Sequence, residues 1–214
     1  MSRNKPASST VPAAYTIDAG GNCLQAVQRP SPNYDRRPDG TGISLLVIHN
    51  ISLPAGQFGG SAIADLFLNQ LDFAAHPDFI SLQGVRVSTH FLIRRDGQLL
   101  QFVPAGLRAW HAGVSSFQGR SACNDFSVGI ELEGTDQQAF EKAQYQALYR
   151  LTLALIQRYP IQHIVGHQDI APGRKTDPGP HFDWKQYKKL LTQAAQQASM
   201  LVPTHALPSF PFML

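Results

Sequence analysis

The chain is poor in cysteine. Its 214 residues include only two, Cys23 and Cys123. Two cysteines are too few for the disulfide framework that stabilises small secreted domains. We therefore expect two free thiols in a reducing compartment, and a single bridge between them is the alternative.

Long hydrophobic runs are also missing. No segment reaches the roughly 20 apolar residues that a membrane-spanning helix needs. The N-terminal stretch MSRNKPASSTVPAAYTIDAGG has no apolar centre of the length found in secretory signals. We expect a cytoplasmic protein without a membrane partner.

Charge is nearly balanced, with a formal net charge of +3. Basic residues occur in scattered pairs, such as Arg36-Arg37 and Lys188-Lys189, and form no basic run. This pattern argues against a nucleic-acid partner and is compatible with a small anionic substrate. The hydrophobic fraction of 43% is that of an ordinary globular protein, which argues against a disordered chain.

The length suits a single domain with a sizeable core. Residues 1–14, rich in Ser, Pro and Ala, are expected to form a flexible N-terminal tail. Residues 15–200 are expected to fold, and residues 201–214, with three prolines, to form an irregular C-terminal extension.

Hydrophobic periodicity predicts an α/β protein. The apolar run Leu45–Ile48 is typical of a strand covered on both faces, and Asp96-Gly97 between two strand-like runs indicates a hairpin. The predicted strands are Ser44–His49, Ser127–Glu133 and 161–166, the hairpin is 87–103, and the predicted helices are Ser61–Leu71, Ala139–Tyr159 and Trp184–Met200.

Three residues far apart in the sequence suggest one metal site. His49 and His167 each follow a short apolar run, where a buried strand would deliver a ligand to a sheet edge, and Asp177 lies in a Pro- and Gly-rich loop. Two imidazoles and one carboxylate are a ligand set of catalytic zinc, with the fourth position open to water. The alternatives are hydrogen-bonded core histidines and a turn-forming aspartate.

Glu131 is the candidate general base and acid. It stands between apolar neighbours in SVGIELE, where a carboxylate is costly without a partner or a function. Glu133 competes with it, and a structural ion pair with an arginine is the alternative for either. Lys175, two residues before Asp177, could stabilise an oxyanion or could be an ordinary solvated lysine.

Substrate contacts are harder to assign. Trp110 and His111 offer an apolar surface and a hydrogen-bond donor, although the tryptophan could instead fill the core. Arg86, Arg95 and Arg120 could bind carboxylates, but nothing in the sequence separates them from surface ion pairs.

From Val27 to Tyr187 the chain resembles the zinc-dependent N-acetylmuramoyl-L-alanine amidases, in particular those acting on 1,6-anhydro-muropeptides. The resemblance rests on motifs in the family's order, among them LLVIHNISLP, VSTHFLIRRDG, RAWHAGVS, CNDFSVGIELEGTD and GHQDIAPGRKTDPGP. It implies a single domain with a mixed central β-sheet packed by helices, a fold shared with peptidoglycan recognition proteins.

The resemblance also implies a role for each candidate residue. It implies zinc ligation by His49, His167 and Asp177, catalysis by Glu131 and Lys175, and substrate binding by Asn50, Arg86, Trp110 and His111. Wider relatives often carry a cysteine where Asp177 stands, and the carboxylate remains compatible with zinc.

The implied function is hydrolysis of the amide between anhydro-N-acetylmuramic acid and the L-alanine of a small muropeptide, in peptidoglycan recycling, by a monomer. Two alternatives remain. One is a non-catalytic peptidoglycan-binding module, and the other is an exported amidase that attacks intact cell wall. The complete set of candidate residues argues against the first, and the missing signal sequence argues against the second.

Overall fold

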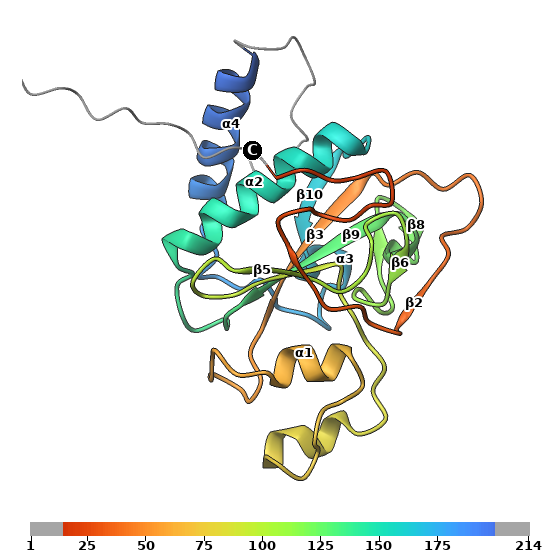
Figure 1. Cartoon of the computed structure of the whole chain (residues 1–214), viewed down its shortest axis with the longest axis vertical. Coiled ribbons are helices and arrows are strands. Elements are labelled where there is room, and N and C mark those ends of the chain that lie inside the picture. The colour runs from red at the N-terminus through yellow and green to blue at the C-terminus, as the bar shows by residue number, and fades with distance from the viewer. Residues whose placement is uncertain (1–14, 200–214) are drawn as a thin grey trace, which may run out of the picture.

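A six-stranded sheet forms the centre of the protein in the computed structural model, which describes residues 15–199 (Figure 1). Strand β3 pairs in parallel with β9 and β10, β9 pairs in parallel with β4, and β4 pairs antiparallel with β5. The predicted mixed sheet is therefore confirmed. In sheet order the strands are β1 Val27–Gln28, β5 Leu99–Gln101, β4 Phe91–Ile93, β9 Ser127–Glu133, β3 Leu45–Ile51 and β10 His163–Gly166.

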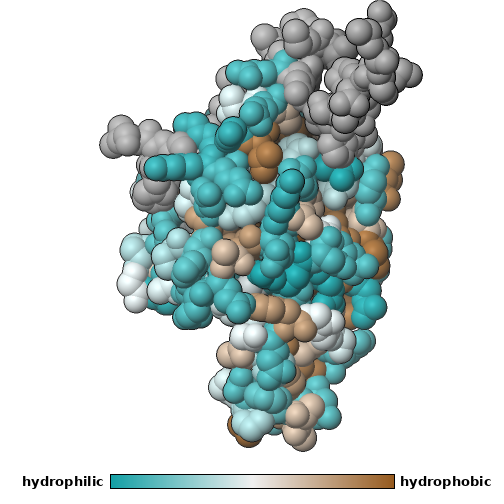
Figure 2. Space-filling model, turned by 90° about the vertical axis from the view of Figure 1, so that its left-hand side faces the viewer, coloured by the Kyte–Doolittle hydropathy of each residue, from teal (hydrophilic) through white to brown (hydrophobic). Residues whose placement is uncertain are grey.

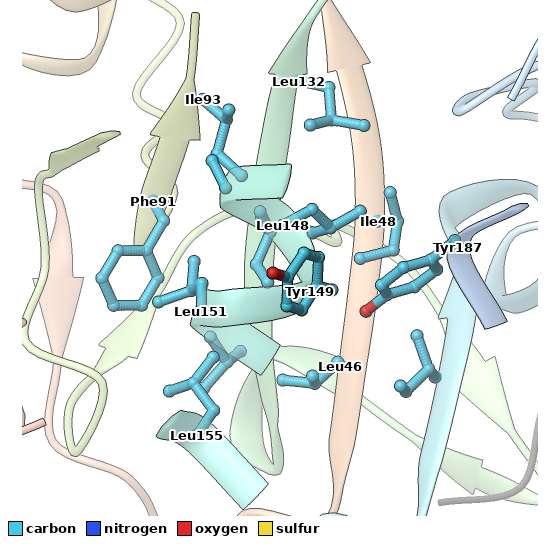
Figure 3. Packing of buried hydrophobic residues seen from close by; sticks show 14 of the residues in the cluster. Leu46, Ile48, Phe91, Ile93, Leu132, Leu148, Tyr149, Leu151, Leu155 and Tyr187 are labelled. Atoms are coloured by element: carbon cyan, nitrogen blue, oxygen red, sulfur yellow. The ribbon is translucent and has the colours of Figure 1, made fainter. Parts of the chain in front are cut away.

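Two long helices cover one face of this sheet. Helices α2 (Lys142–Arg158) and α4 (Trp184–Ser199) pack Leu148 and Tyr187 against Leu46 and Ile48 of β3 (Figure 3). Successive strand residues point to opposite faces. Leu45 and Val47 of β3 accordingly pack into a second cluster, with residues from α3 and the preceding loops.

Smaller elements complete the other face and the rim. They are α1 Ala62–Phe67, α3 His167–Ile170, the 3-10 helices Pro77–Leu82 and Cys123–Asp125, and two short strand pairs, β2 Tyr34–Asp35 with β6 Arg108–Ala109 and β7 Ser116–Phe117 with β8 Arg120–Ser121. Figure 2 shows a mainly hydrophilic surface on one side, with hydrophobic residues in small areas.

Most predicted elements are present, with shifted ends. The helix predicted over Ser61–Leu71 ends at Phe67, because Asn69 takes the left-handed conformation at φ 59°. Leu71 still packs with that helix's apolar side chains, but from the following loop. Helix α2 begins later than predicted, at Lys142, where Glu141 and Gln144 form a capping box.

The thiol prediction is confirmed, because Cys23 and Cys123 are both free and buried. Among the described helices, none has the length and apolar character to cross a membrane. The expected N-terminal tail, 1–14, and C-terminal extension, 201–214, lie outside the described residues.

Leu148 tests the packing of α2 on the sheet. It is fully buried, so we expect Leu148→Ala to lower the free energy of unfolding by about 2–5 kcal/mol through lost burial and the cavity left behind. Val114, which is 87% exposed, is the control, and Val114→Ala should cost less than about 0.5 kcal/mol. Urea denaturation measures both, and equal effects would contradict the packing described.

Candidate metal centre

The parallel strands bring the predicted ligands to one edge of the sheet. His49 lies near the C-terminal end of β3, His167 follows β10 directly as the first residue of α3, and Asp177 lies in the loop after α3. His49 Nδ1 is 3.0 Å from His167 Nδ1 and 3.0 Å from Asp177 Oδ2, and the last two atoms are 3.1 Å apart. Three donor atoms from distant parts of the chain thus converge on one point.

This triangle fits a tetrahedral metal ion. Zinc bonds of about 2.0–2.1 Å at tetrahedral angles put neighbouring donor atoms about 3.3 Å apart. The observed 3.0–3.1 Å is slightly tighter, so a small outward movement of the side chains would complete the geometry. The side chains of His49 and His167 are almost fully buried, and that of Asp177 is 14% exposed. The structure brings the three candidates together, and their ligation of a metal stays a prediction.

The histidines present the nitrogens that a metal requires. His167 Nε2 lies 3.1 Å from the carbonyl oxygen of Ala112, which can only accept a hydrogen bond, so Nε2 carries the hydrogen and Nδ1 of the neutral ring keeps its lone pair. Burial lowers the pKa of His49 to about 4, which favours the neutral ring.

Glu131 lies beside the ligands with one oxygen unsatisfied. It is the register partner of His49 across β3 and β9, and its Oε1 is 4.0 Å from His49 Nδ1. Its Oε2 is buried and has no hydrogen-bond partner. Burial raises the pKa of Glu131 well above its ordinary value, Asp177 raises it further, and the positive charge of Lys175 opposes both. An unsatisfied buried carboxyl group is rare and calls for a functional explanation.

Glu133, the competing candidate, has a structural role. Its Oε1 accepts a hydrogen bond from the Gly59 backbone at 2.7 Å, and its Oε2 accepts one from the Arg95 backbone at 3.1 Å. Arg94 also lies 3.5 Å from Oε1. Glu133 is therefore satisfied as a carboxylate, whereas Glu131 is not.

A cavity of about 700 Å³ opens beside the triangle and is lined in part by Asn50, Lys175 and Asp177. Lys175 is exposed to solvent. The Asn50 amide donates to Asp136 at 2.6 Å and to the Pro178 carbonyl at 3.1 Å. The cavity wall thus includes three predicted site residues, Asn50, Lys175 and Asp177, together with Asp136, which the sequence analysis missed.

The other predicted substrate contacts have different surroundings. Trp110 is partly buried, and its indole N–H donates to Asp35 at 2.6 Å. His111 is buried, and both ring nitrogens lie within hydrogen-bonding distance of protein atoms. Arg86 is exposed and lines a separate cavity of about 80 Å³ with Leu66.

Arg37 is a supporting residue that the sequence analysis counted among scattered surface charges. Its guanidinium donates to the carbonyl oxygens of Asn124, Asp125, Ala105 and Ser127 at 2.8–3.1 Å. Burial lowers the pKa of Arg37 to about 10. The arginine thereby joins the segment before β9 to its neighbours, and no pattern in the sequence indicated this role.

Comparisons with known proteins fit this geometry. A family model described as N-acetylmuramoyl-L-alanine amidase matches residues 39–180. The chain belongs to this family. A curated relative, 1,6-anhydro-N-acetylmuramyl-L-alanine amidase AmpD of Citrobacter freundii, is 57% identical over 179 residues, which cover 83% of this chain and 96% of the relative.

Solved structures agree with the amidase assignment. A crystal structure of a Se-Met AmpD derivative has a TM-score of 0.79 and 56% identity, and the match covers 82% of this chain and 98% of that one. The amidase AmiD from E. coli, in complex with its substrate anhydro-N-acetylmuramic acid-L-Ala-D-γ-Glu-L-Lys, has a TM-score of 0.51 and 32% identity, covering 82% of this chain and 65% of that chain. The predicted family, fold and enzyme class are confirmed, and the chain is an amide hydrolase.

Metal binding can be tested directly. We expect the purified amidase to bind about one zinc ion per chain, as a three-ligand site implies. His167→Ala removes one buried donor and should weaken zinc binding at least 100-fold in chelator competition. His181 is exposed near the same loop, and His181→Ala should leave the affinity unchanged. Equal affinities in the two variants would place the metal elsewhere.

Proposed function

We propose that this amidase hydrolyses the amide between anhydro-N-acetylmuramic acid and L-alanine in small muropeptides, with zinc held by His49, His167 and Asp177. The observation that carries the proposal is the triangle of three donor atoms with the unpartnered Glu131 carboxyl beside it. A binding module has no need for such a carboxyl. The names of the AmpD relatives and the substrate in the AmiD complex support the choice of substrate.

Zinc in this position would polarise the scissile carbonyl and lower the pKa of a water molecule toward neutrality. Glu131 would accept the proton of that water and return it to the departing amine nitrogen. Its raised pKa suits both steps, because a general base and acid works best when its pKa is near the working pH. Breaking the amide bond in this way leaves a lactyl carboxylate and a free peptide amine.

Lys175 would add positive charge where the carbonyl oxygen becomes negative. It lines the same cavity as Asp177, and its charge acts on both His49 and Glu131. Removing a preorganised donor of this kind commonly costs about 100- to 1000-fold in rate. Arg174 extends the positive charge along the cavity wall, which suits the carboxylates of a stem peptide.

The cellular setting is part of the proposal. A cytoplasmic monomer acting on soluble wall fragments would serve peptidoglycan recycling, as expected from the sequence. We further propose that residues 15–200 form the zinc amidase domain, which includes the residues that the family model matches.

Glu131→Gln tests the catalytic role. The change keeps the size of the side chain but removes its ability to take up a proton, so kcat should fall at least 100-fold while zinc content stays near one per chain. Product release from a soluble anhydro-muropeptide and metal analysis measure the two quantities. Gln138 is exposed and lines the same cavity. Gln138→Ala is therefore a control for general damage to the site. A Glu131→Gln enzyme of normal kcat would remove Glu131 from the mechanism.

Substrate preference is tested with soluble anhydro-muropeptide and intact sacculi, at equal concentrations of the amide bond that is cleaved. We expect rapid cleavage of soluble anhydro-muropeptide and little release from intact sacculi, because the cavity of about 700 Å³ beside the triangle has the size of a small-ligand site. Cleavage of sacculi alone would support a wall-degrading amidase, and zinc binding without cleavage of either substrate would support a binding module.

A further inference from the structure

The two ligand histidines are supported by one dipeptide, His111-Ala112, in the loop between β6 and β7. Ala112 presents its carbonyl oxygen to His167 Nε2 at 3.1 Å. His111 Nδ1 lies 3.0 Å from His49 Nε2. The Asn124 side chain accepts from the backbone N–H groups of both His111 and Ala112, at 3.1 and 2.8 Å. The dipeptide is therefore held in place independently of the histidines it contacts.

A contact between two imidazoles does not by itself say which nitrogen carries the proton. Here a buried serine decides it. The Ser127 hydroxyl lies 2.6 Å from the carbonyl oxygen of Cys123 and 3.1 Å from His111 Nε2. A carbonyl can only accept, so the one hydroxyl proton of Ser127 goes to Cys123. Ser127 Oγ must then accept from His111, and His111 Nε2 carries a hydrogen.

The contacts of His111 also determine which ring nitrogen of His49 carries a hydrogen. His111 is buried, and no carboxylate is among its described ring partners, so its ring is neutral and Nδ1 keeps a lone pair. That lone pair accepts a hydrogen bond from the Nε2–H group of His49. His49 then has no hydrogen on Nδ1, the atom that points to His167 and Asp177.

We propose that His111 is a positioning residue for the metal site: anchored by Ser127, it fixes the orientation and tautomer of His49 so that Nδ1 remains available to zinc. This inference rests on the proposed zinc site. It also assigns His111 a role other than the expected contact with substrate. Such outer partners of a ligating histidine commonly change metal affinity about 10- to 100-fold.

The packing of His111 indicates that the fold holds its ring in this position. Its ring lies directly over Gly129 of β9, where a side-chain carbon would come within 2.5 Å of His111 Cγ. Only glycine leaves room for the ring at this place, two residues from both Ser127 and Glu131. The strand that supplies the proposed acid and base thus also supplies the anchor and the space for His111.

The wild-type protein gives the first test. Long-range ¹H–¹⁵N NMR of the metal-free protein, labelled at histidine, distinguishes the two tautomers. We expect His49, His111 and His167 all to carry the proton on Nε2. A His111 protonated on Nδ1 would reverse the chain of donors and overturn the proposal.

Variants give the second test, by chelator competition for zinc. His111→Phe keeps a ring but removes the acceptor, and zinc affinity should fall about 10- to 100-fold. His111→Asn returns an oxygen near the position of Nδ1 and should recover most of the loss. His181→Phe is the matched control on an exposed histidine and should bind as the wild type does. Full affinity in His111→Phe, or no recovery in His111→Asn, would contradict the proposal.

A third variant covers the case in which His111→Phe does not fold. Ser127→Ala removes the anchor but keeps the ring, and should weaken zinc binding and produce a mixture of His49 tautomers. An unchanged tautomer and affinity in Ser127→Ala would overturn the role of the anchor. A wild-type protein that binds no zinc would instead refute the proposed function, so the two failures are distinguishable.

Discussion

The site depends on the parallel pairing of β3 with β9 and β10. Parallel strands deliver the residues at their C-terminal ends to one edge of the sheet. The register His49 to Glu131, and Ile48 to Gly166, sets the proposed base beside one ligand and places the other ligand one residue beyond its strand. A one-residue shift of β9 would turn Glu131 to the opposite face. Val128, Ile130 and Leu132 of β9 oppose such a shift, because they are buried in the core under α2 and α4 and would move to the other face.

Polar groups near this edge fall into two kinds. Most have hydrogen-bond partners, such as Glu133, which accepts from two backbone N–H groups, and Arg37, whose two terminal nitrogens donate to four carbonyl oxygens. The three donor atoms of the triangle and Glu131 Oε2 are different, since the donor atoms have mainly one another as partners and Oε2 has none. Buried groups left in this state are destabilising unless a ligand or a reaction completes them. The satisfied groups hold the unsatisfied ones in place.

Much of this could be predicted from the sequence. The apolar run of β3 and the alternating pattern of β9 located both central strands, and Asp96-Gly97 located the hairpin. Short motifs then indicated His49, Glu131, His167 and Asp177 as one site. The end of α1 at Phe67 could not be predicted, because the apolar pattern of the helix continues to Leu71, which lies in the following loop.

The residues that support the site could not be predicted from the sequence either. Ser127, Asn124 and Arg37 act through contacts between segments far apart in sequence, and each is of a common residue type without a pattern of its own. The sequence favoured substrate contact for His111 because its neighbour Trp110 suggests a binding surface. Only the folded structure brings its two ring nitrogens beside His49 and Ser127.

The most direct test of the account is an anomalous difference map, measured at the zinc absorption edge, from crystals of the zinc-loaded protein. The account predicts one strong peak about 2.0–2.2 Å from His49 Nδ1, His167 Nδ1 and an Asp177 carboxylate oxygen. A peak bound by other residues, or by the Nε2 atom of either histidine, would contradict it.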